Sequence, residues 1–386
     1  SFFMRCGFQI GTGAKIHINP FLKIFFNKPL TSPADRVEAG LAEWLDGRVT
    51  RCAGNEQTGC KSVHRTLIGA LGKALYLANK KPMVTPPLLE PGNTIGIVAP
   101  ARSIEMKALR AFIAMIAGRD YSVRFGRHLF GRQDQFSGSD RERREDLEEM
   151  IRDPEVNAVI AARGGYGSVR ILSRLNPELF RKHPKWVVGY SDISALHAWL
   201  NFTVGMESVH GPMPYSFFTY PPADEDSFQS LFTILEGNPV SYALADHPLN
   251  NPGKAAGTIT GGNLSVLYSL AGTPVEPDYE GAILFLEEVD EYLYHIDRML
   301  MNFELREVFR KIAGLVVGDF SRMQDNTTPF GTGALEMIAE RAHRYNVPAI
   351  FGFPGGHETR NRSLIFGRDG TLTGGEGKNL LRLYRI

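Results

Sequence analysis

A serine stands where an apolar run meets a segment of helical spacing, in the stretch 187–194 (VVGYSDIS). A sharp turn between a buried strand and a helix holds a serine hydroxyl outward and points the next backbone N–H groups at the same space. This pattern predicts Ser191 as a nucleophile, with Gly189 relieving crowding inside the turn. The familiar G-x-S-x-G elbow is only half met, because Ile193 stands where its second glycine would be. The alternative is that Ser191 simply caps the helix, as serines commonly do.

A glycine-rich stretch, 163–167 (RGGYG), follows the apolar run 156–162 and is a second candidate site. Adjacent glycines let the backbone approach a ligand closely and leave N–H groups free to bind an anion. The turn therefore indicates an oxyanion hole, a phosphate cradle or only a tight turn. No Gly-Lys-Ser/Thr follows, so the Walker pattern is absent, and the missing G-x-G-x-x-G pattern argues against a dinucleotide.

Two further candidates follow apolar runs in the second half of the chain. Glu287 comes after the run 282–286, and His357 ends the stretch 352–357 (GFPGGH). Alone, an acid at a strand end is usually solvated or ion-paired, and a lone histidine usually carries no chemistry. With Ser191 they form a possible nucleophile, base and orienting acid, because imidazole titrates near neutrality and a carboxylate fixes its tautomer. The chain order proves nothing, because unrelated folds use different orders.

Metal chemistry finds little support in the sequence. The ten histidines are scattered without an H-x-x-x-H pair, and the three cysteines all lie before residue 82. We therefore predict no metal site. His197 lies on an apolar helix face, which indicates a structural role. His210 follows a short apolar run and is a candidate for facing the same cleft as Ser191.

Elements of two kinds alternate around the first two candidates. Strands are predicted at 94–100, 121–125, 156–162 and 186–190, and helices at 103–117, 139–152 and 192–200, with Ser103 and Ser139 as helix starts. Strands that alternate with helices predict a parallel sheet covered on both faces. In such sheets functional groups gather at the carboxyl ends of the strands.

The pattern changes after about residue 240. Prolines and a glycine over 241–253 predict a linker. The following half has short apolar runs at 282–286, 314–318 and 349–352, with helical spacing over 263–271 and 333–344. We predict a second, mixed α/β domain over 254–386, after a nucleophile-bearing domain over 83–240.

Residues 1–82 differ in composition from the rest. They hold 12 Lys/Arg against 5 Asp/Glu, whereas the whole chain of 386 residues has a net charge of +1. We interpret them as a basic extension that is poorly ordered or not part of the enzyme, with Met83 as a natural start; the alternative is a small accessory module. The overall charge gives no argument for nucleic acid as a partner. No apolar run reaches the roughly 20 residues of a membrane helix, and three cysteines exclude a disulfide-stapled secreted scaffold.

Several of these motifs occur together in the order of a known family. They resemble the LD-carboxypeptidases, serine peptidases that include the muropeptide LD-carboxypeptidase and the microcin C immunity peptidase. The resemblance covers roughly residues 86–386 and rests on the stretches 91–100, 163–167, 189–197, 210–212, 261–264 and 355–357. It implies a flavodoxin-like N-terminal domain, a smaller swivelling C-terminal domain, an active site between them and a homodimer.

The resemblance also implies roles for particular residues. The family's serine, glutamate and histidine fall on Ser191, Glu287 and His357, and its oxyanion donors on the backbone N–H groups of Gly165 and Asp192. Glu288 stands where the family usually has Asp, so the acid could be either neighbour. We favour Glu287, because successive residues of a strand point to opposite faces and only one can meet the histidine. A second departure is Ala101-Arg102, which stands where a serine often follows the first strand's proline.

The implied reaction is hydrolysis of an amide between an L-centre and a terminal D-residue, such as release of D-Ala from a murein tetrapeptide in peptidoglycan recycling in the cytoplasm. It needs no metal or organic cofactor and no membrane. An exopeptidase also has to hold the terminal carboxylate, a task that suits a guanidinium. Arg163 is our preferred candidate, ahead of Arg298 and Arg360, and Tyr166 and His210 are weaker candidates for substrate contact. The alternatives are a peptidase acting on a peptidyl-nucleotide toxin, a non-catalytic anion-binding module and an esterase.

Overall fold

The computed structural model describes residues 7–9, 15–17, 83–219, 222–375 and 377–384. The chain divides into two units, Ser1–Lys81 and Pro82–Ile386. In the first unit the structure describes two short antiparallel strands, β1 (Gly7–Gln9) and β2 (Lys15–His17). The other residues of the predicted extension 1–82 lie outside the described part of the chain, so our interpretation of it stays a prediction.

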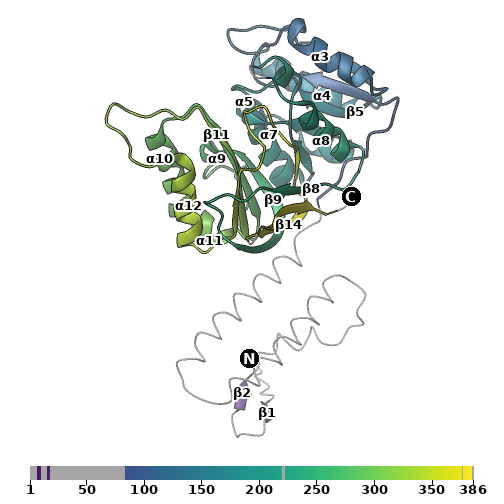
Figure 1. The fold of residues 1–386 in the computed structure, drawn as a ribbon. Helices are drawn as coiled ribbons and strands as arrows, with labels where there is room; N and C mark the ends of the chain where they lie inside the picture. The colour runs from purple at the N-terminus through teal and green to yellow at the C-terminus, as the bar shows by residue number, and fades with distance from the viewer. Residues whose placement is uncertain (1–6, 10–14, 18–82, 220–221, 376, 385–386) are drawn as a thin grey trace. The chain divides into compact units, whose positions relative to one another are not determined.

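The second unit contains two sheets with helices packed on them (Figure 1). The first sheet has six strands in the order β13-β7-β6-β5-β3-β4. Five strands run parallel, as expected of strands joined by helices. They are β3 (Thr94–Val98), β4 (Ser122–Phe125), β5 (Val156–Ala161), β6 (Trp186–Gly189) and β7 (Ser208–His210). The predicted parallel α/β domain is confirmed.

Helices cover both faces of this sheet, as the unbroken apolar runs of its strands require. Ala158 and Ile160 of β5 pack in one core with α3 (Met106–Ala117) and α8 (Glu225–Leu235). Their neighbour Val159 belongs to a separate core. The helices of that core are α4 (Asp140–Arg152), α5 (Val169–Leu172), α6 (Pro177–Lys182) and α7 (Ser194–Trp199).

One of the two predicted helix starts is correct. Ser139 caps α4 in a reciprocal capping box with Glu142. The prediction that Ser103 caps α3 is wrong, because the N-cap is Glu105, whose side chain makes no capping bond. Ser103 lies two residues earlier, and its own backbone N–H donates to the carbonyl of Gln135.

The second sheet has seven strands in the order β12-β11-β10-β9-β14-β15-β8. Four strands are parallel: β9 (Gly253–Asn263), β10 (Ile283–Val289), β11 (Gly314–Ser321) and β12 (Ala349–Phe351). The others pair antiparallel: β8 (Ser241–Leu244), β14 (Asp369–Gly374) and β15 (Asn379–Leu383). This sheet confirms the predicted mixed α/β second half, and β8 lies inside the segment that we predicted as a linker.

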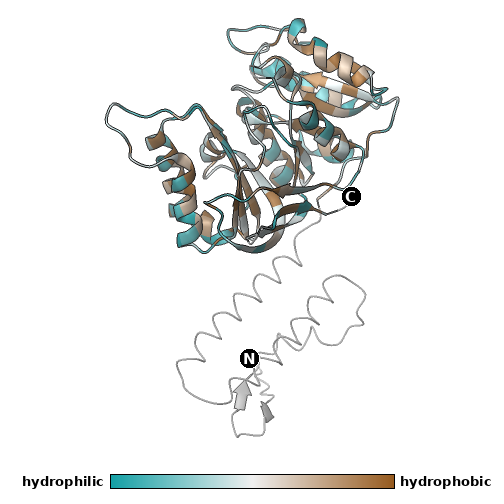
Figure 2. Cartoon of the chain, in the orientation of Figure 1, coloured by the Kyte–Doolittle hydropathy of each residue, from teal (hydrophilic) through white to brown (hydrophobic). Residues whose placement is uncertain are grey.

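Four helices belong to the second sheet: α9 (Leu264–Ser269), α10 (Leu293–Leu305), α11 (Val308–Lys311) and α12 (Ala334–Arg344). Their apolar side chains share one core with β10 and β11. Figure 2 shows α10 and α12 with hydrophilic and hydrophobic residues on opposite sides, as expected of helices that cover one face of a sheet.

A late segment of the chain returns to the first sheet. Strand β13 (Leu364–Phe366) pairs antiparallel with β7 and forms the edge of the first sheet. Just beyond it, the Nε of Arg368 donates to Glu207 Oε1 over 2.8 Å, and both side chains are buried. The two halves of the unit are thus joined by backbone pairing as well as by an ion pair.

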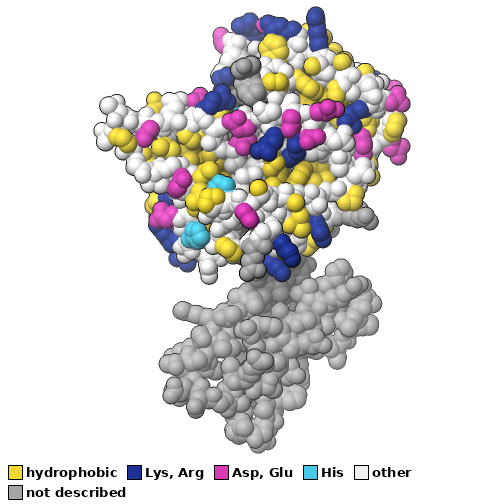
Figure 3. All heavy atoms as spheres, viewed as in Figure 1, with side chains coloured by type: hydrophobic (Ala, Val, Ile, Leu, Met, Phe, Trp, Pro, Cys, Tyr) yellow, Lys and Arg dark blue, Asp and Glu magenta, His cyan; other side chains and the backbone are white. Residues whose placement is uncertain are grey.

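The surface carries charges of both signs. On the face shown in Figure 3, acidic and basic side chains are interspersed rather than segregated. None of the helices in the described ranges is both long and apolar enough to cross a membrane.

We expect a shortened chain that begins at Met83 to fold with unchanged stability. The second unit begins its own contacts at Val84, which bonds with Gly205 and Glu207, and Leu89 N donates to Leu235 O. Thermal unfolding followed by circular dichroism compares the shortened and full chains. A chain that begins at Glu90 lacks these bonds and is the matched, less stable control. If the chain that begins at Met83 is insoluble while the full chain is soluble, the prediction is contradicted.

We expect Arg368→Met to lower the free energy of unfolding by about 3–5 kcal/mol, because it leaves the carboxylate of Glu207 buried and unpaired. Arg382→Met, an exposed change on β15, is the control and should cost no more than about 0.5 kcal/mol. Adding Glu207→Leu to Arg368→Met should recover part of the loss. Denaturant unfolding measures all three variants, and equal effects of the two arginine changes would refute the buried-pair argument.

Candidate active site

Ser191 opens the short 3₁₀ helix η2 (Ser191–Ile193) directly after β6 and Tyr190. Its backbone has φ of 63°, a left-handed conformation that costs a non-glycine residue about 1–3 kcal/mol and is typical of functional sites. A Cβ on Gly189 would lie 2.8 Å from Cγ1 of Ile193, so only glycine fits there. Ile193 is fully buried, which explains why the position is not the second glycine of an elbow.

The glycine-rich turn after β5 lies against this serine. A Cβ on Gly164 would lie 3.0 Å from the Cβ and 3.2 Å from the Oγ of Ser191. Gly165 and Gly167 have φ of 116° and 140°, values that favour glycine. The backbone can therefore approach the hydroxyl closely, as a group that stabilises charge on a reacting carbonyl must.

Asp192 ties the two turns together. Its buried carboxylate accepts hydrogen bonds from the N–H groups of Ser168 (2.8 Å) and Gly167 (3.3 Å), and its carbonyl accepts one from Ser168 Oγ (2.6 Å). Burial raises the pKa of Asp192, and the bonds from Ser168 and Gly167 oppose that rise. The backbone N–H of Asp192 is one predicted oxyanion donor; its side chain positions the turn that carries the other.

Arg143 is a positioning residue that the sequence did not reveal. It lies on α4 and is 1% exposed. Its Nη1 donates to the carbonyls of Pro100 and Gly167, and its Nη2 to Asp140. One guanidinium therefore connects the loop after β3 with the glycine-rich turn after β5.

His357 and Glu287 are hydrogen-bonded, with Nδ1 of the imidazole 2.8 Å from Oε2 of the carboxylate. Glu287 is fully buried at the carboxyl end of β10. Gly356 has φ of 139°, and a Cβ there would lie 3.3 Å from the Cβ of Glu287, so a glycine lets the chain pass close to the acid. The imidazole lies 5.0 Å from the ring of Tyr190, centroid to centroid, and Tyr190 directly precedes Ser191.

The pKa of His357 reflects two opposing effects. Burial favours the neutral ring, but the charge and hydrogen bond of Glu287 favour the cation and raise the pKa above its usual value. In the neutral ring, Nδ1–H donates to Glu287, which leaves Nε2 as the proton acceptor. This is the tautomer that a general base next to a serine needs.

Glu288 points away from His357. Its carboxylate accepts from Asn263 Nδ2 (2.8 Å) and from the backbone N–H of Ser265 (2.6 Å). Burial and the neighbouring charge of Glu287 raise its pKa to about 7. In this structure Glu287 is the acid bonded to the histidine.

The remaining predicted residues differ in their surroundings. Tyr166 is 45% exposed beside the glycine-rich turn. The guanidinium of Arg163 lies 4.2 Å from the ring centre of Tyr215 and donates to Ser103 O. Arg298 lies over the ring of Tyr294 on α10.

The expectation that His210 faces the cleft is not met in the structure. Its ring is fully buried among Tyr190, Phe285 and Phe366, and neither ring nitrogen has a hydrogen-bond partner. Burial lowers its pKa well below the usual value. His210 is the last residue of the short strand β7, but Phe285 of the second sheet lies against its ring.

Three residues near the site were missed by the sequence reasoning. The pKa values of Tyr190 and His357 are both raised, and the charge of Arg322 opposes the rise in each. Arg102 lies against Gly165, where a Cβ would be 2.5 Å from its Cδ. Asp319 lies next to Gly356, and burial together with Glu287 raises its pKa to about 7. Arg322 and Asp319 lie at the carboxyl end of β11, so the strand-end rule would have found both.

Within the ranges that the structure describes, no three His, Cys, Asp or Glu side chains gather as a metal site.

Comparison with known families finds two matches in this chain. Residues 95–211 match the LD-carboxypeptidase N-terminal domain, and residues 256–372 match the LD-carboxypeptidase C-terminal domain. These two ranges contain every candidate catalytic residue.

Individual proteins give the same picture. A probable murein peptide carboxypeptidase of Bacillus subtilis is 35% identical over 290 residues, which is 74% of this chain and 89% of the relative. The Microcin C7 self-immunity protein MccF of Escherichia coli is 25% identical over 72% of this chain and 89% of its own length. The crystal structure of muramoyltetrapeptide carboxypeptidase from Oxalobacter formigenes superposes with a TM-score of 0.70 at 30% identity, covering 75% of this chain and 98% of that one.

We expect Glu287→Gln to lower the pKa of His357. The change removes the charge and the acceptor that favour the imidazolium, while the burial that favours the neutral ring remains. Glu288→Gln is the matched control; it removes a more weakly coupled charge and should shift the pKa less. NMR titration of the His357 ring measures each value. A larger shift in the Glu288 variant would overturn our assignment of the acid.

Proposed function

The chain belongs to the LD-carboxypeptidase family, and from this premise we propose that it is a serine carboxypeptidase that cleaves an amide between an L-centre and a terminal D-amino acid. The observation that carries the proposal is the hydrogen bond between His357 and Glu287. It supplies a buried acid and an oriented base, and the imidazole ring contacts the residue before the strained Ser191.

Ser191 is the nucleophile in this proposal. His357 Nε2 takes the proton from the hydroxyl as Oγ attacks the carbonyl carbon, and Glu287 stabilises the imidazolium that forms. His357 then gives the proton to the leaving amine. In the second half of the reaction His357 takes a proton from water as that water attacks the acyl-enzyme, and it returns the proton to Ser191 Oγ as the ester bond breaks. The left-handed backbone at Ser191 keeps the hydroxyl at the turn's tip before substrate arrives.

The oxyanion meets the backbone N–H groups of Gly165 and Asp192. One such donor is worth about 3 kcal/mol in comparable enzymes. Both turns are held by buried bonds, those of Asp192 to Ser168 and of Arg143 to Gly167, so the donors need little reorganisation during the reaction. Fixed dipoles are most effective under that condition.

We assign the terminal carboxylate of the substrate to Arg322 rather than to Arg163. Arg322 follows β11, whose Phe320 pairs with Glu288, the neighbour of the acid that bonds to His357. Arg163 is already stacked on Tyr215 and bonded to Ser103. Arg298, on the exposed face of α10, has no comparable link to the imidazole.

The substrate that we propose is a murein tetrapeptide that loses its terminal D-Ala in peptidoglycan recycling. The relatives named as murein peptide and muramoyltetrapeptide carboxypeptidases support it, at 35% and 30% identity. The homodimer and the cytoplasmic location that the resemblance implies stay predictions.

A second candidate substrate is a peptidyl-nucleotide toxin. The relation to the Microcin C7 self-immunity protein, over 89% of that protein's length, favours this alternative. Both reactions use the same three side chains, so the distinction rests on the substrate and not on the catalytic groups.

We expect Ser191→Ala to lower hydrolysis of an LD-terminated tetrapeptide by about 10⁴-fold or more, because the nucleophile is lost while the fold remains. Mass spectrometry of products from LD- and LL-terminated tetrapeptides gives the rate and the bond specificity. Thermal unfolding of the variant is the control for the fold. Activity within about tenfold of the parent would reject Ser191 as the nucleophile, and equal cleavage of LL-terminated peptides would reject the proposed bond.

A further inference from the structure

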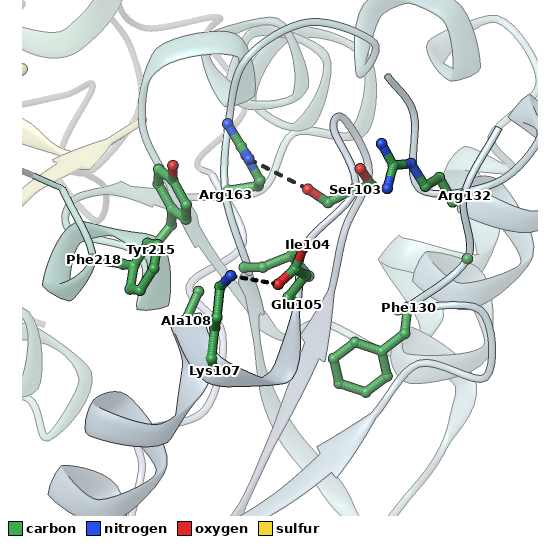
Figure 4. A pocket seen from close by; sticks show the side chains of 11 residues that line it. Ser103, Ile104, Glu105, Lys107, Ala108, Phe130, Arg132, Arg163, Tyr215 and Phe218 are labelled. Carbon is green, nitrogen blue, oxygen red and sulfur yellow. Dashed lines mark hydrogen bonds and ion pairs between the residues drawn. The ribbon is translucent and has the colours of Figure 1, made fainter. Parts of the chain in front are cut away.

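A cavity of about 420 Å³ opens beside the glycine-rich turn (Figure 4). Its walls come from four segments that follow the carboxyl ends of strands β3, β4, β5 and β7, the same edge of the sheet that carries Ser191 after β6. The lining residues are Ser103, Ile104, Glu105, Lys107, Ala108, Phe130, Gly131, Arg132, Arg163, Tyr215 and Phe218.

The cavity adjoins the candidate catalytic centre through one peptide unit. Arg163 lines the cavity, and the next residue, Gly164, contacts Ser191. Tyr215 lies beside Arg163 and is fixed to the same strand end, because Tyr215 N donates to Ala162 O over 3.0 Å. The cavity is therefore next to the turn that lies against Ser191.

The charges around the cavity favour an anion. Lys107, Arg132 and Arg163 line it against a single acid, Glu105. Glu105 is already paired with Lys107 at 2.8 Å, and Arg163 is engaged by Tyr215 and Ser103 O, which leaves Arg132 as the cation that the cavity offers to a ligand. Figure 4 shows the ion pair of Lys107 and Glu105 and, separately, the bond of Arg163 to Ser103 O. The guanidinium of Arg163 also lies over the ring of Tyr215.

The walls also offer apolar contact. Phe130 and Phe218 are 43% and 49% exposed, so both side chains can still pack against a ligand. Guanidinium groups beside exposed rings suit a carboxylate on a carbon stem, since the planar fork matches a carboxylate and the rings pack on the stem.

We propose that this cavity binds a carboxylate of the substrate peptide that lies on the acyl side, away from the cleaved bond. The proposal rests on the proposed peptidase function and names what that function selects. Murein peptides offer two such groups, the α-carboxylate of the γ-linked D-Glu and the side-chain carboxylate of a third-position diaminopimelate. Both share the same chemistry, and the experiment separates them.

The test compares two pairs of tetrapeptides that each differ in one carboxylate. One pair is L-Ala-γ-D-Glu-L-Lys-D-Ala and its D-isoglutamine form; the other carries diaminopimelate with a free or an amidated side-chain carboxylate. We expect the full chain to prefer the free carboxylate in at least one pair by about fivefold or more in kcat/KM. The pair that shows the preference identifies the group bound.

Arg132→Gln should reduce that preference to below about twofold by raising KM for the free carboxylate. Arg152→Gln removes the same charge from an exposed position in the last turn of α4, outside the cavity, and should keep the preference. Preference retained in Arg132→Gln, or absent from the full chain in both pairs, would overturn the proposal.

Binding separates this proposal from the proposed function. Calorimetry of the same peptides with Ser191→Ala, with and without Arg132→Gln, measures the cavity's contribution without turnover. If the free carboxylate binds more tightly and Arg132→Gln removes the difference, the cavity proposal stands even where no peptide is cut. If Ser191→Ala binds the free and amidated peptides equally, the proposal fails even where the full chain cleaves both.

Discussion

The hydrogen bond between His357 and Glu287 is formed on the side of the second sheet, whereas Ser191, the nucleophile that we propose it serves, follows a strand of the first. The catalytic arrangement therefore depends on how firmly the two sheets are held together. Contacts of three kinds contribute: Asn263 N donates to Ser194 Oγ at the start of α7, Arg368 pairs with Glu207, and β13 joins β7. Ser194 lies three residues after Ser191, so one of these contacts adjoins the proposed chemistry.

Buried charge and local strain are concentrated in the same place. Ser191 is left-handed, Glu287 is fully buried, and Glu288 and Asp319 carry carboxyl groups with pKa values near 7. Such features lower stability and persist because the surrounding structure fixes them. Glu288 has donors of its own in Asn263 and Ser265, whereas Oε1 of Glu287 and Oδ2 of Asp319 are buried without a hydrogen-bond partner.

Much of this arrangement followed from local patterns in the sequence. Apolar runs located β3, β5, β6, β10 and β11. Strand alternation predicted that only one of two adjacent acids meets the histidine, and in the structure Glu287 bonds to His357 while Glu288 bonds to Asn263. The residues that were missed act over long sequence distances. Arg143 reads as one more charge on a polar helix, and only the packing of α4 against two strand ends gives it a role. The burial of His210 likewise depends on Phe285 and Phe366, which lie far along the chain.

The edge strand β13 has a consequence for biosynthesis. The first sheet begins with β3 near residue 94, and its edge strand β13 is formed by residues 364–366. The ribosome therefore has to translate most of the second sheet before β13 can pair with β7. Domains that end before the next begins can mature one after the other during translation. Here the nascent nucleophile-bearing half keeps an open edge until residue 366 has emerged, so a competent hydrolase arises late rather than partway through synthesis.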